Sequence, residues 1–173
     1  LYGFRERERI QSLFESVTGA RMMHNYIRVG GVKADLPDDF GARMAELMDQ
    51  LKAGIEECDG LLTNNEMFLV RTKGIGSISA EDAIDYGVTG PAWRAAGVLE
   101  DVRISEPYGV YDRFQFGIPV GTNGDCWDRY YVRIEEMRQS LSIVQQAMER
   151  LEPGPLMAKV RRIARPPKGE VYM

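Results

Sequence analysis

Histidine and cysteine are scarce in this chain of 173 residues. The sequence has one histidine, His24, and two cysteines, Cys58 and Cys126, which lie far apart. A zinc site needs several such ligands at close spacing, and no C-x-x-C pair occurs. We therefore expect neither a metal site built inside the chain nor a disulfide framework, and a reducing compartment is the simpler interpretation.

Long apolar runs and an excess of positive charge are also missing. No stretch approaches the roughly 18–20 apolar residues of a membrane helix. The net charge is −4, whereas nucleic-acid-binding domains are usually basic, so we expect no nucleic-acid partner. The first residues, LYGFRERERI, do not have the pattern of a signal peptide, and a start on Leu1 is expected of a chain cut from something longer.

What the sequence does contain is helical periodicity. With 44% hydrophobic and 28% charged residues, a folded domain with a real core is expected. Three segments place apolar residues on one helical face. The faces comprise Ile10, Leu13, Phe14 and Val17; then Phe40, Met44, Leu47, Met48, Leu51, Ile55, Cys58 and Leu62; and finally Trp127, Tyr130, Ile134, Met137, Leu141, Val144, Met148 and Leu151.

Shorter signals lie between these helices. Residues 24–32, HNYIRVGGV, predict a strand or a bulged turn, and the alternation of Phe114, Phe116, Ile118 and Val120 allows a short strand. Two pairs resemble helix caps, Thr63 with Glu66 and Ser79 with Asp82. Pro91 could open one more short turn.

These elements predict a mainly α, multihelical fold with short β-hairpin or strand pieces. We expect residues 1–155 to form one helical domain and residues 156–173 to form an extended, basic and proline-rich tail. That tail could meet a partner or anionic lipid, although a solvated tail is the more common case.

Catalytic motifs are weak in this sequence. No serine–histidine–aspartate order or nucleophile elbow occurs, and GIGSIS at 74–79 lacks the third glycine of a dinucleotide loop. The residues alone therefore indicate a helical domain that works through partners.

Several long blocks, in a consistent order, resemble the D-type subunit of respiratory complex I, the proton-pumping NADH–quinone oxidoreductase. They are FRERE, TGARMMHNYIRVGGVKADLP, GVTGPAWRAAGV, YDRFQFGIPVGTNGDCWDRYYVRIEEMRQSL and PPKGEVY, and they run through nearly the whole chain. That family is similar to the large subunit of nickel–iron hydrogenases, so the resemblance implies a multihelical, hydrogenase-large-subunit-like fold.

The resemblance implies a function that depends on partners. The family's subunit sits in the peripheral arm, beside the subunit that carries the terminal [4Fe–4S] cluster, and the two form the site of quinone reduction. No cofactor is then expected on this chain alone, because quinone and the cluster lie at the partner interface. The expected partners are other complex I subunits, above all the terminal-cluster subunit and the membrane-arm subunits. The expected location is peripheral, on the cytoplasmic side of a bacterial plasma membrane.

The resemblance also implies site residues. The family's quinone histidine and tyrosine precede the first matching block, but the loop with Met23, His24, Arg28, Gly30 and Gly31 matches one that lies near the cluster. Many members have histidine where this chain has Met23, and His24 follows it. For both His24 and Arg28 a purely structural role stays open.

A charged group on the third long helix is a candidate subunit interface, with a solvated helix face as the alternative. Its members are Arg129, Arg133, Glu136 and Arg138.

Two other functional classes remain open from the sequence. One is the large subunit of a related complex, either ferredoxin-fed or of the hydrogenase type. The hydrogenase type would need pairs of cysteines near both ends of the full chain, and none is visible here. The other is a scaffold or interaction module that is inactive on its own.

Overall fold

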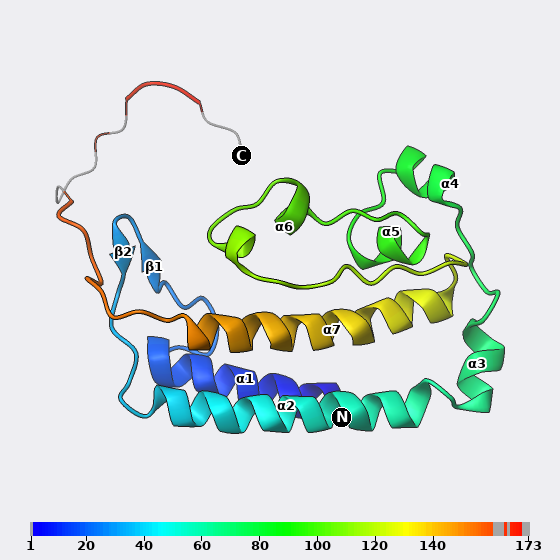
Figure 1. Cartoon of the computed structure of the whole chain (residues 1–173), viewed down its shortest axis with the longest axis horizontal. Helices are drawn as coiled ribbons and strands as arrows, with labels where there is room; N and C mark the ends of the chain where they lie inside the picture. The colour runs from blue at the N-terminus through cyan, green and yellow to red at the C-terminus, as the bar shows by residue number, and fades with distance from the viewer. Residues whose placement is uncertain (1, 161–164, 166, 171–173) are drawn as a thin grey trace.

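The computed structural model describes residues 2–160, 165 and 167–170. Three long helices dominate it: α1 (Tyr2–Thr18), α2 (Phe40–Leu62) and α7 (Cys126–Glu149). Both α1 and α7 pack against α2, and α7 runs antiparallel to α2 (Figure 1). At 1.5 Å per residue, α7 is about 36 Å long. The mainly α architecture predicted from the sequence is confirmed.

Short helices and loops cover the side of α7 that faces away from α1 and α2 (Figure 1). The chain leaves α2 through α3 (Glu66–Thr72), which turns at the end of the bundle. It then forms α4 (Ala80–Asp85), α5 (Pro91–Ala95), α6 (Val102–Ser105) and the 3-10 turn η1 (Tyr111–Arg113). Of these elements, α5 makes the most extensive contact with α7.

The small sheet is a hairpin of β1 (Ile27–Arg28) and β2 (Gly31–Val32). The strands are antiparallel, with Ile27 opposite Val32 and Arg28 opposite Gly31. The beginning of the predicted tail pairs with this hairpin at one point, where Gly31 forms an isolated antiparallel bridge with Met157. Arg161 and Arg162 of that tail lie outside the described residues.

The caps explain where several helices begin. The Ser79 hydroxyl accepts a hydrogen bond from the N–H of Asp82, as predicted. The predicted Thr63–Glu66 cap is wrong. Asn65 caps α3 by accepting from the N–H of Phe68, while the Thr63 hydroxyl is bonded instead to Asp59 and Tyr130. Thr63 continues the α2 conformation and so cannot start a new helix.

The strand considered for residues 114–120 is also absent from this part of the structure. The segment is irregular, and two of its amides bond to side chains of α7. The N–H of Gln115 donates to Gln146, and the N–H of Gly117 donates to Gln139. Alternation of apolar residues fits any extended chain with one covered face, so it did not distinguish this segment from a true strand.

The core lies around α7. Val132 is 2% exposed and Ile134 is 3% exposed, and Leu47 and Ile55 of α2 are buried as well. These buried residues lie on two helices that pack against each other. In the described part of the chain, no helix is both long and apolar enough to cross a bilayer.

Candidate functional site: the 19–32 loop and the adjoining groove

The loop that follows α1 has an unusual backbone. Gly19 ends the helix with φ +78°, and the N–H of Gly19 still donates to the carbonyl of Glu15. Further on, Met23 and Asn25 have φ values of +54° and +44°, a region that residues with a Cβ rarely occupy. Two such residues flank His24, so local strain is concentrated at the candidate position.

His24 is half-buried at the end of α1. Its Nδ1 lies 3.0 Å from the carbonyl oxygen of Ala20 and 3.3 Å from the hydroxyl of Thr18. The imidazole also meets the ring of Phe14 at a centroid distance of 5.0 Å. Because a carbonyl can only accept, Nδ1 carries the proton in the neutral tautomer, and Nε2 is left as the acceptor.

Met23 points elsewhere. Its side chain is 90% exposed, whereas His24 lies against Phe14. Both residues precede β1 in irregular backbone, so the alternation of a strand does not apply to them. The two side chains nevertheless lie in different environments. The side chain of Met23 is exposed to solvent, and that of His24 is packed against Phe14.

The glycine pair has a clear structural reason. A Cβ on Gly31 would come within 2.0 Å of the Leu156 carbonyl oxygen, and one on Gly30 within 2.7 Å of Val160. The close approach allows two backbone hydrogen bonds, from the N–H of Val32 to Leu156 at 2.9 Å and from the N–H of Ala158 to Gly30 at 2.8 Å. The glycines therefore let residues 156–158 lie beside the hairpin.

Arg28 lies on the exposed hairpin. Among the described residues it has no hydrogen bond or ion pair with a carboxylate. Its neighbours Ile27 and Val29 are 84% and 77% exposed. The hairpin thus presents a fixed positive charge between two apolar side chains, a combination suited to contact with another molecule.

The charged group on α7 is used mainly within the chain. Arg129 donates to the carbonyls of Gly124 and Gly76, at 2.5 Å and 2.8 Å. Glu136 accepts from Arg94 at 2.6 Å. These bonds fasten the loops around α7, and whether the same residues also meet another subunit stays a prediction.

The other two members of this charged group, Arg138 and Arg133, differ in their hydrogen-bond partners. Arg138 donates to Asp59 of α2 at 2.6 Å, and the hydroxyl of Thr63 together with this guanidinium lowers the pKa of Asp59. Arg133 is exposed, and among the described residues its guanidinium bonds only to the carbonyl of Arg129 on its own helix.

Buried acids form a part of the structure that the sequence analysis missed. Asp128 is 4% exposed and accepts from the N–H groups of Thr122 and Asn123. Asp101 is 6% exposed and accepts from Arg103 at 2.6 Å. Their position next to a helix start was the available signal, since carboxylates favour the first turn.

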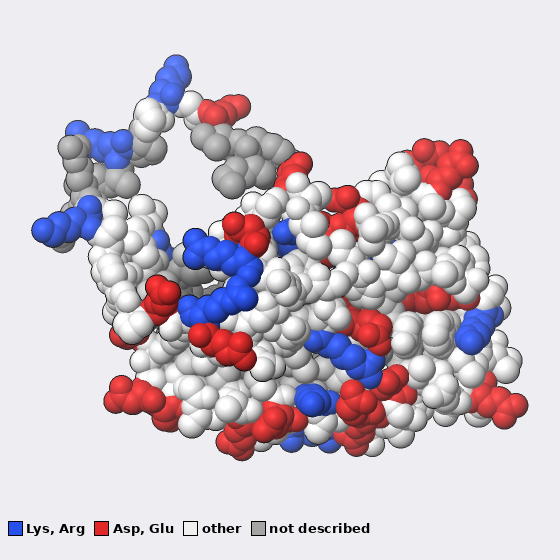
Figure 2. All heavy atoms as spheres, viewed as in Figure 1, with Lys and Arg blue, Asp and Glu red and all other residues white. Residues whose placement is uncertain are grey.

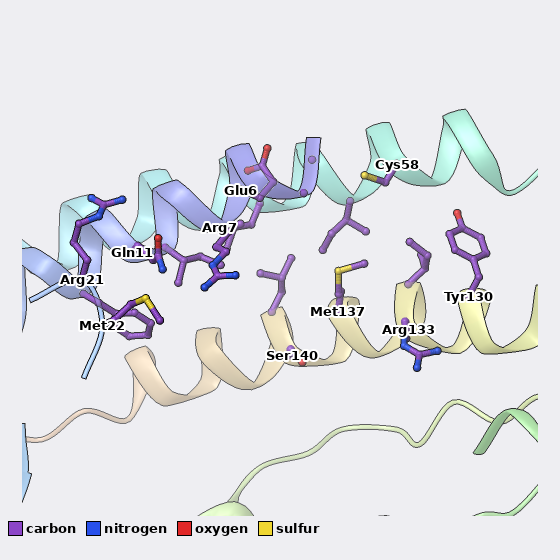
Figure 3. A pocket seen from close by; sticks show the side chains of 18 of the residues that line it. Glu6, Arg7, Gln11, Arg21, Met22, Cys58, Tyr130, Arg133, Met137 and Ser140 are labelled. Atoms are coloured by element: carbon purple, nitrogen blue, oxygen red, sulfur yellow. The ribbon is translucent and has the colours of Figure 1, made fainter. Parts of the chain in front are cut away.

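A groove opens between α1, α2 and α7, with a volume of about 850 Å³. Figure 3 shows Met137 and Tyr130 of α7 pointing into it, with Arg7 and Gln11 of α1 opposite. His24 and Met22 line the end nearest the loop. The apolar lining comes from all three helices and includes Ile10, Phe14, Leu51, Ile55, Met137 and Leu141.

Charge is unevenly distributed over the surface. Figure 2 shows acidic side chains along the edge formed by α2, with some basic ones among them, and further acidic side chains at the tip formed by α4. Within the described residues, no three histidine, cysteine or acidic side chains are placed to hold a metal ion.

Residues 1–173 match the family described as the 49 kDa subunit of respiratory-chain NADH dehydrogenase. The chain belongs to this family. Curated relatives are named as the D-type subunit of NADH-quinone oxidoreductase. The protein from Myxococcus xanthus is 54% identical over 166 residues, which cover 96% of this chain and 40% of the relative.

Two further relatives agree. The protein from Carboxydothermus hydrogenoformans is 48% identical over 172 residues, 99% of this chain and 47% of its own. The protein from Geotalea uraniireducens is 50% identical over 172 residues, 99% of this chain and 44% of its own. The chain thus spans less than half the length of these relatives. The predicted resemblance to this complex I family is confirmed.

Proposed function

We propose that this chain forms part of the peripheral-arm subunit of a proton-translocating NADH–quinone oxidoreductase. In this proposal it helps to build the site of quinone reduction beside the terminal [4Fe–4S] cluster of a partner subunit. The observation that carries the proposal is the match of the whole chain to the family, together with relatives named for that enzyme.

In the proposed assembly, the reacting cofactors and the membrane attachment come from outside this chain. Quinone and the cluster lie at the interface with the terminal-cluster subunit, and the membrane-arm subunits are further partners. The subunit is then peripheral, on the cytoplasmic side of the bacterial plasma membrane. The name of the relatives favours this over a hydrogenase-type, ferredoxin-fed or scaffold role.

The exposed hairpin is the part that we place toward the cluster. An electron added to a cluster is stabilised by a nearby fixed cation, and Arg28 is an exposed guanidinium with no carboxylate partner among the described residues. His24 is held beside this hairpin by the hydrogen bond from its Nδ1 to the carbonyl of Ala20, which leaves Nε2 free to accept. Gly30 and Gly31 support the loop by letting the segment around Leu156 and Met157 approach it closely.

A chimera tests the function directly. These 173 residues replace the matching segment in the full-length relative from Myxococcus xanthus, and NADH–quinone reductase activity is measured in membranes of a strain that lacks its own copy of this subunit. We expect activity to return in the chimera and to be absent from the isolated 173-residue chain. An assembled complex with a normal terminal cluster but no quinone reduction would contradict the proposal.

Arg28→Lys in the chimera tests the placement of the loop. The change keeps the charge but removes the planar fork, so we expect an altered terminal-cluster signal in electron paramagnetic resonance and slower quinone reduction. Arg43→Lys is the matched control, because Arg43 lies on the exposed face of α2.

The isolated chain separates a site role from a structural one. In that chain Arg28→Lys should change the free energy of unfolding by less than about 0.5 kcal/mol. A normal cluster signal together with a strongly lowered melting midpoint would assign Arg28 to the fold.

A further inference from the structure

The α1–α2–α7 groove leaves apolar surface in contact with water. Phe14 of α1 is 45% exposed and Met137 of α7 is 40% exposed, and both line the groove. Below them, Ile55 and Ile134 are buried and form its floor. Such a contiguous apolar surface on several elements is typical of a site that another element covers.

The arrangement of the helices indicates the shape of the missing element. Both α1 and α7 pack on α2, and the groove separates α1 from α7 (Figure 3). On α7 the lining residues Tyr130, Ile134, Met137 and Leu141 are spaced by four, three and four. This spacing is the seam that α7 would offer to a helix lying alongside it. A bundle of three helices with an open fourth position has room for one further helix.

Unbalanced charge at the groove indicates its chemistry. Arg21 is paired with Glu8 and Glu15, and Glu6 is paired with two other arginines of α1. By contrast, Arg7 and Arg133 line the groove with no carboxylate partner among the described residues. An aspartate or glutamate of an occupant would form an ion pair with one of these guanidinium groups.

We propose that the groove seats a helix from the half of the family's subunit that lies outside these 173 residues. That helix has one apolar stripe against α1 and α7 and an acidic residue that faces Arg7 or Arg133. The relatives supply the length, because the matched segment covers only 40–47% of theirs. The proposal rests on packing and family membership and does not depend on the quinone reaction.

Photo-crosslinking in the full-length chimera tests the identity of the occupant. Met137 is replaced by p-benzoylphenylalanine, the purified subunit is irradiated, and the crosslinked peptide is identified by mass spectrometry. We expect a peptide of the same polypeptide, from outside the 173 residues. A crosslink to a second copy, to another subunit or only within the 173 residues would overturn the proposal. The control position is Gln145, which lies on α7 but outside the groove.

The charge requirement is tested with Arg7→Glu and Arg133→Glu, and Arg71→Glu on the exposed face of α3 is the control. In the full-length chimera each groove variant should lower the melting midpoint by about 2–4 °C, the shift expected for one lost charged contact. In the isolated chain the same variants should have no such effect. Equal shifts of the melting midpoint in the chimera and in the isolated chain would show that no acidic residue of the proposed helix pairs with these arginines.

The native cysteines give a second measurement that does not need the chimera to fold. Cys58 lines the groove and Cys126 does not. In the isolated chain an open groove predicts that a maleimide labels Cys58 at a rate independent of protein concentration. A Cys58 protected in the monomer would show that the chain closes its own groove, and protection that grows with concentration would assign the groove to a second copy. Either result overturns the proposal.

Discussion

The two long sides of α7 differ in how they are completed. On the side that faces α5 and the irregular segments, Val132 and Ile143 are buried, and Gln139 and Gln146 bond to the neighbouring backbone. On the side that faces the groove, the floor at Ile134 is buried while Met137 above it stays exposed. The α5 side of α7 is therefore covered by other segments of the chain, whereas the groove side remains open.

The difference follows from the kind of structure on each side. Irregular segments do not bond their own backbone groups as a helix does, and α7 supplies partners for two of these groups from its glutamine side chains. A helix satisfies its own backbone, so the groove side needs only apolar surface and a few charges. Polar bonds thus concentrate on the closed side, and substitutions there should have the largest effects.

Removing the central cation of the closed side should have the largest effect. Arg94 donates to Glu136 at 2.6 Å and to the Glu100 carbonyl at 3.0 Å, and its guanidinium lies 3.9 Å from Asp101. Arg94→Met leaves these groups without their partner, so we expect a loss of about 3–5 kcal/mol in the free energy of unfolding. Urea denaturation measures the loss, with Arg71→Met as the exposed control. A loss no larger than that of the control would show that the closed side is not held by this cation.

On the groove side, the loss in the free energy of unfolding should depend on how deeply the substituted residue is buried. Ile134→Ala empties a buried position and should cost about 2–4 kcal/mol. Leu141→Ala, at a half-buried position on the same seam, should cost only about 1–2 kcal/mol in the isolated chain. Denaturation of both variants in the isolated chain and in the full-length chimera checks this, because a covering helix should enlarge the cost at Leu141. A full cost at Leu141 in the isolated chain would mean that the seam is already covered.

The smallest expected effect depends on pH. Arg103 lowers the pKa of Asp101 in the folded chain, and Arg94 contributes as well. A carboxyl group with a lowered folded pKa stabilises the fold above its unfolded pKa, and the stabilisation is lost as the pH falls through the folded pKa. The difference in stability between the wild type and Asp101→Asn should therefore be present at pH 7 and shrink below about pH 4. A constant difference from about pH 7 to about pH 3 would contradict this.

The fold was largely predictable where the pattern was local. The helix expected from Trp127 to Leu151 is α7, and the Ser79 cap lies where the sequence placed it. The cap at Thr63 failed because Asn65 competes for the same helix start two residues later. The strand near Phe114 failed because its hydrogen-bond partners are side chains of a distant helix, which no local pattern records.

The candidate site was predictable only in part. The hairpin and its glycine pair were expected, but the reason for the glycines was not, since Leu156 approaches them from the far end of the chain. The difference between the two sides of α7 was also hidden. Val132 and Ile143 are simply apolar residues off the main seam, and only the placement of α5 and the loops buries them.

The pairing of residues 156–158 with the hairpin has a consequence for the order of folding. During synthesis from the N-terminus, the hairpin is complete long before residues 156–158 leave the ribosome. Until then, the N–H of Val32 and the carbonyl of Gly30 remain bonded to water. Contacts between distant segments close slowly, because the long loop between them loses entropy. The surface that carries His24 and Arg28 therefore takes its shape only after residues 156–158 have been made, and a partner that binds it can distinguish a chain that has this segment in place from one that does not.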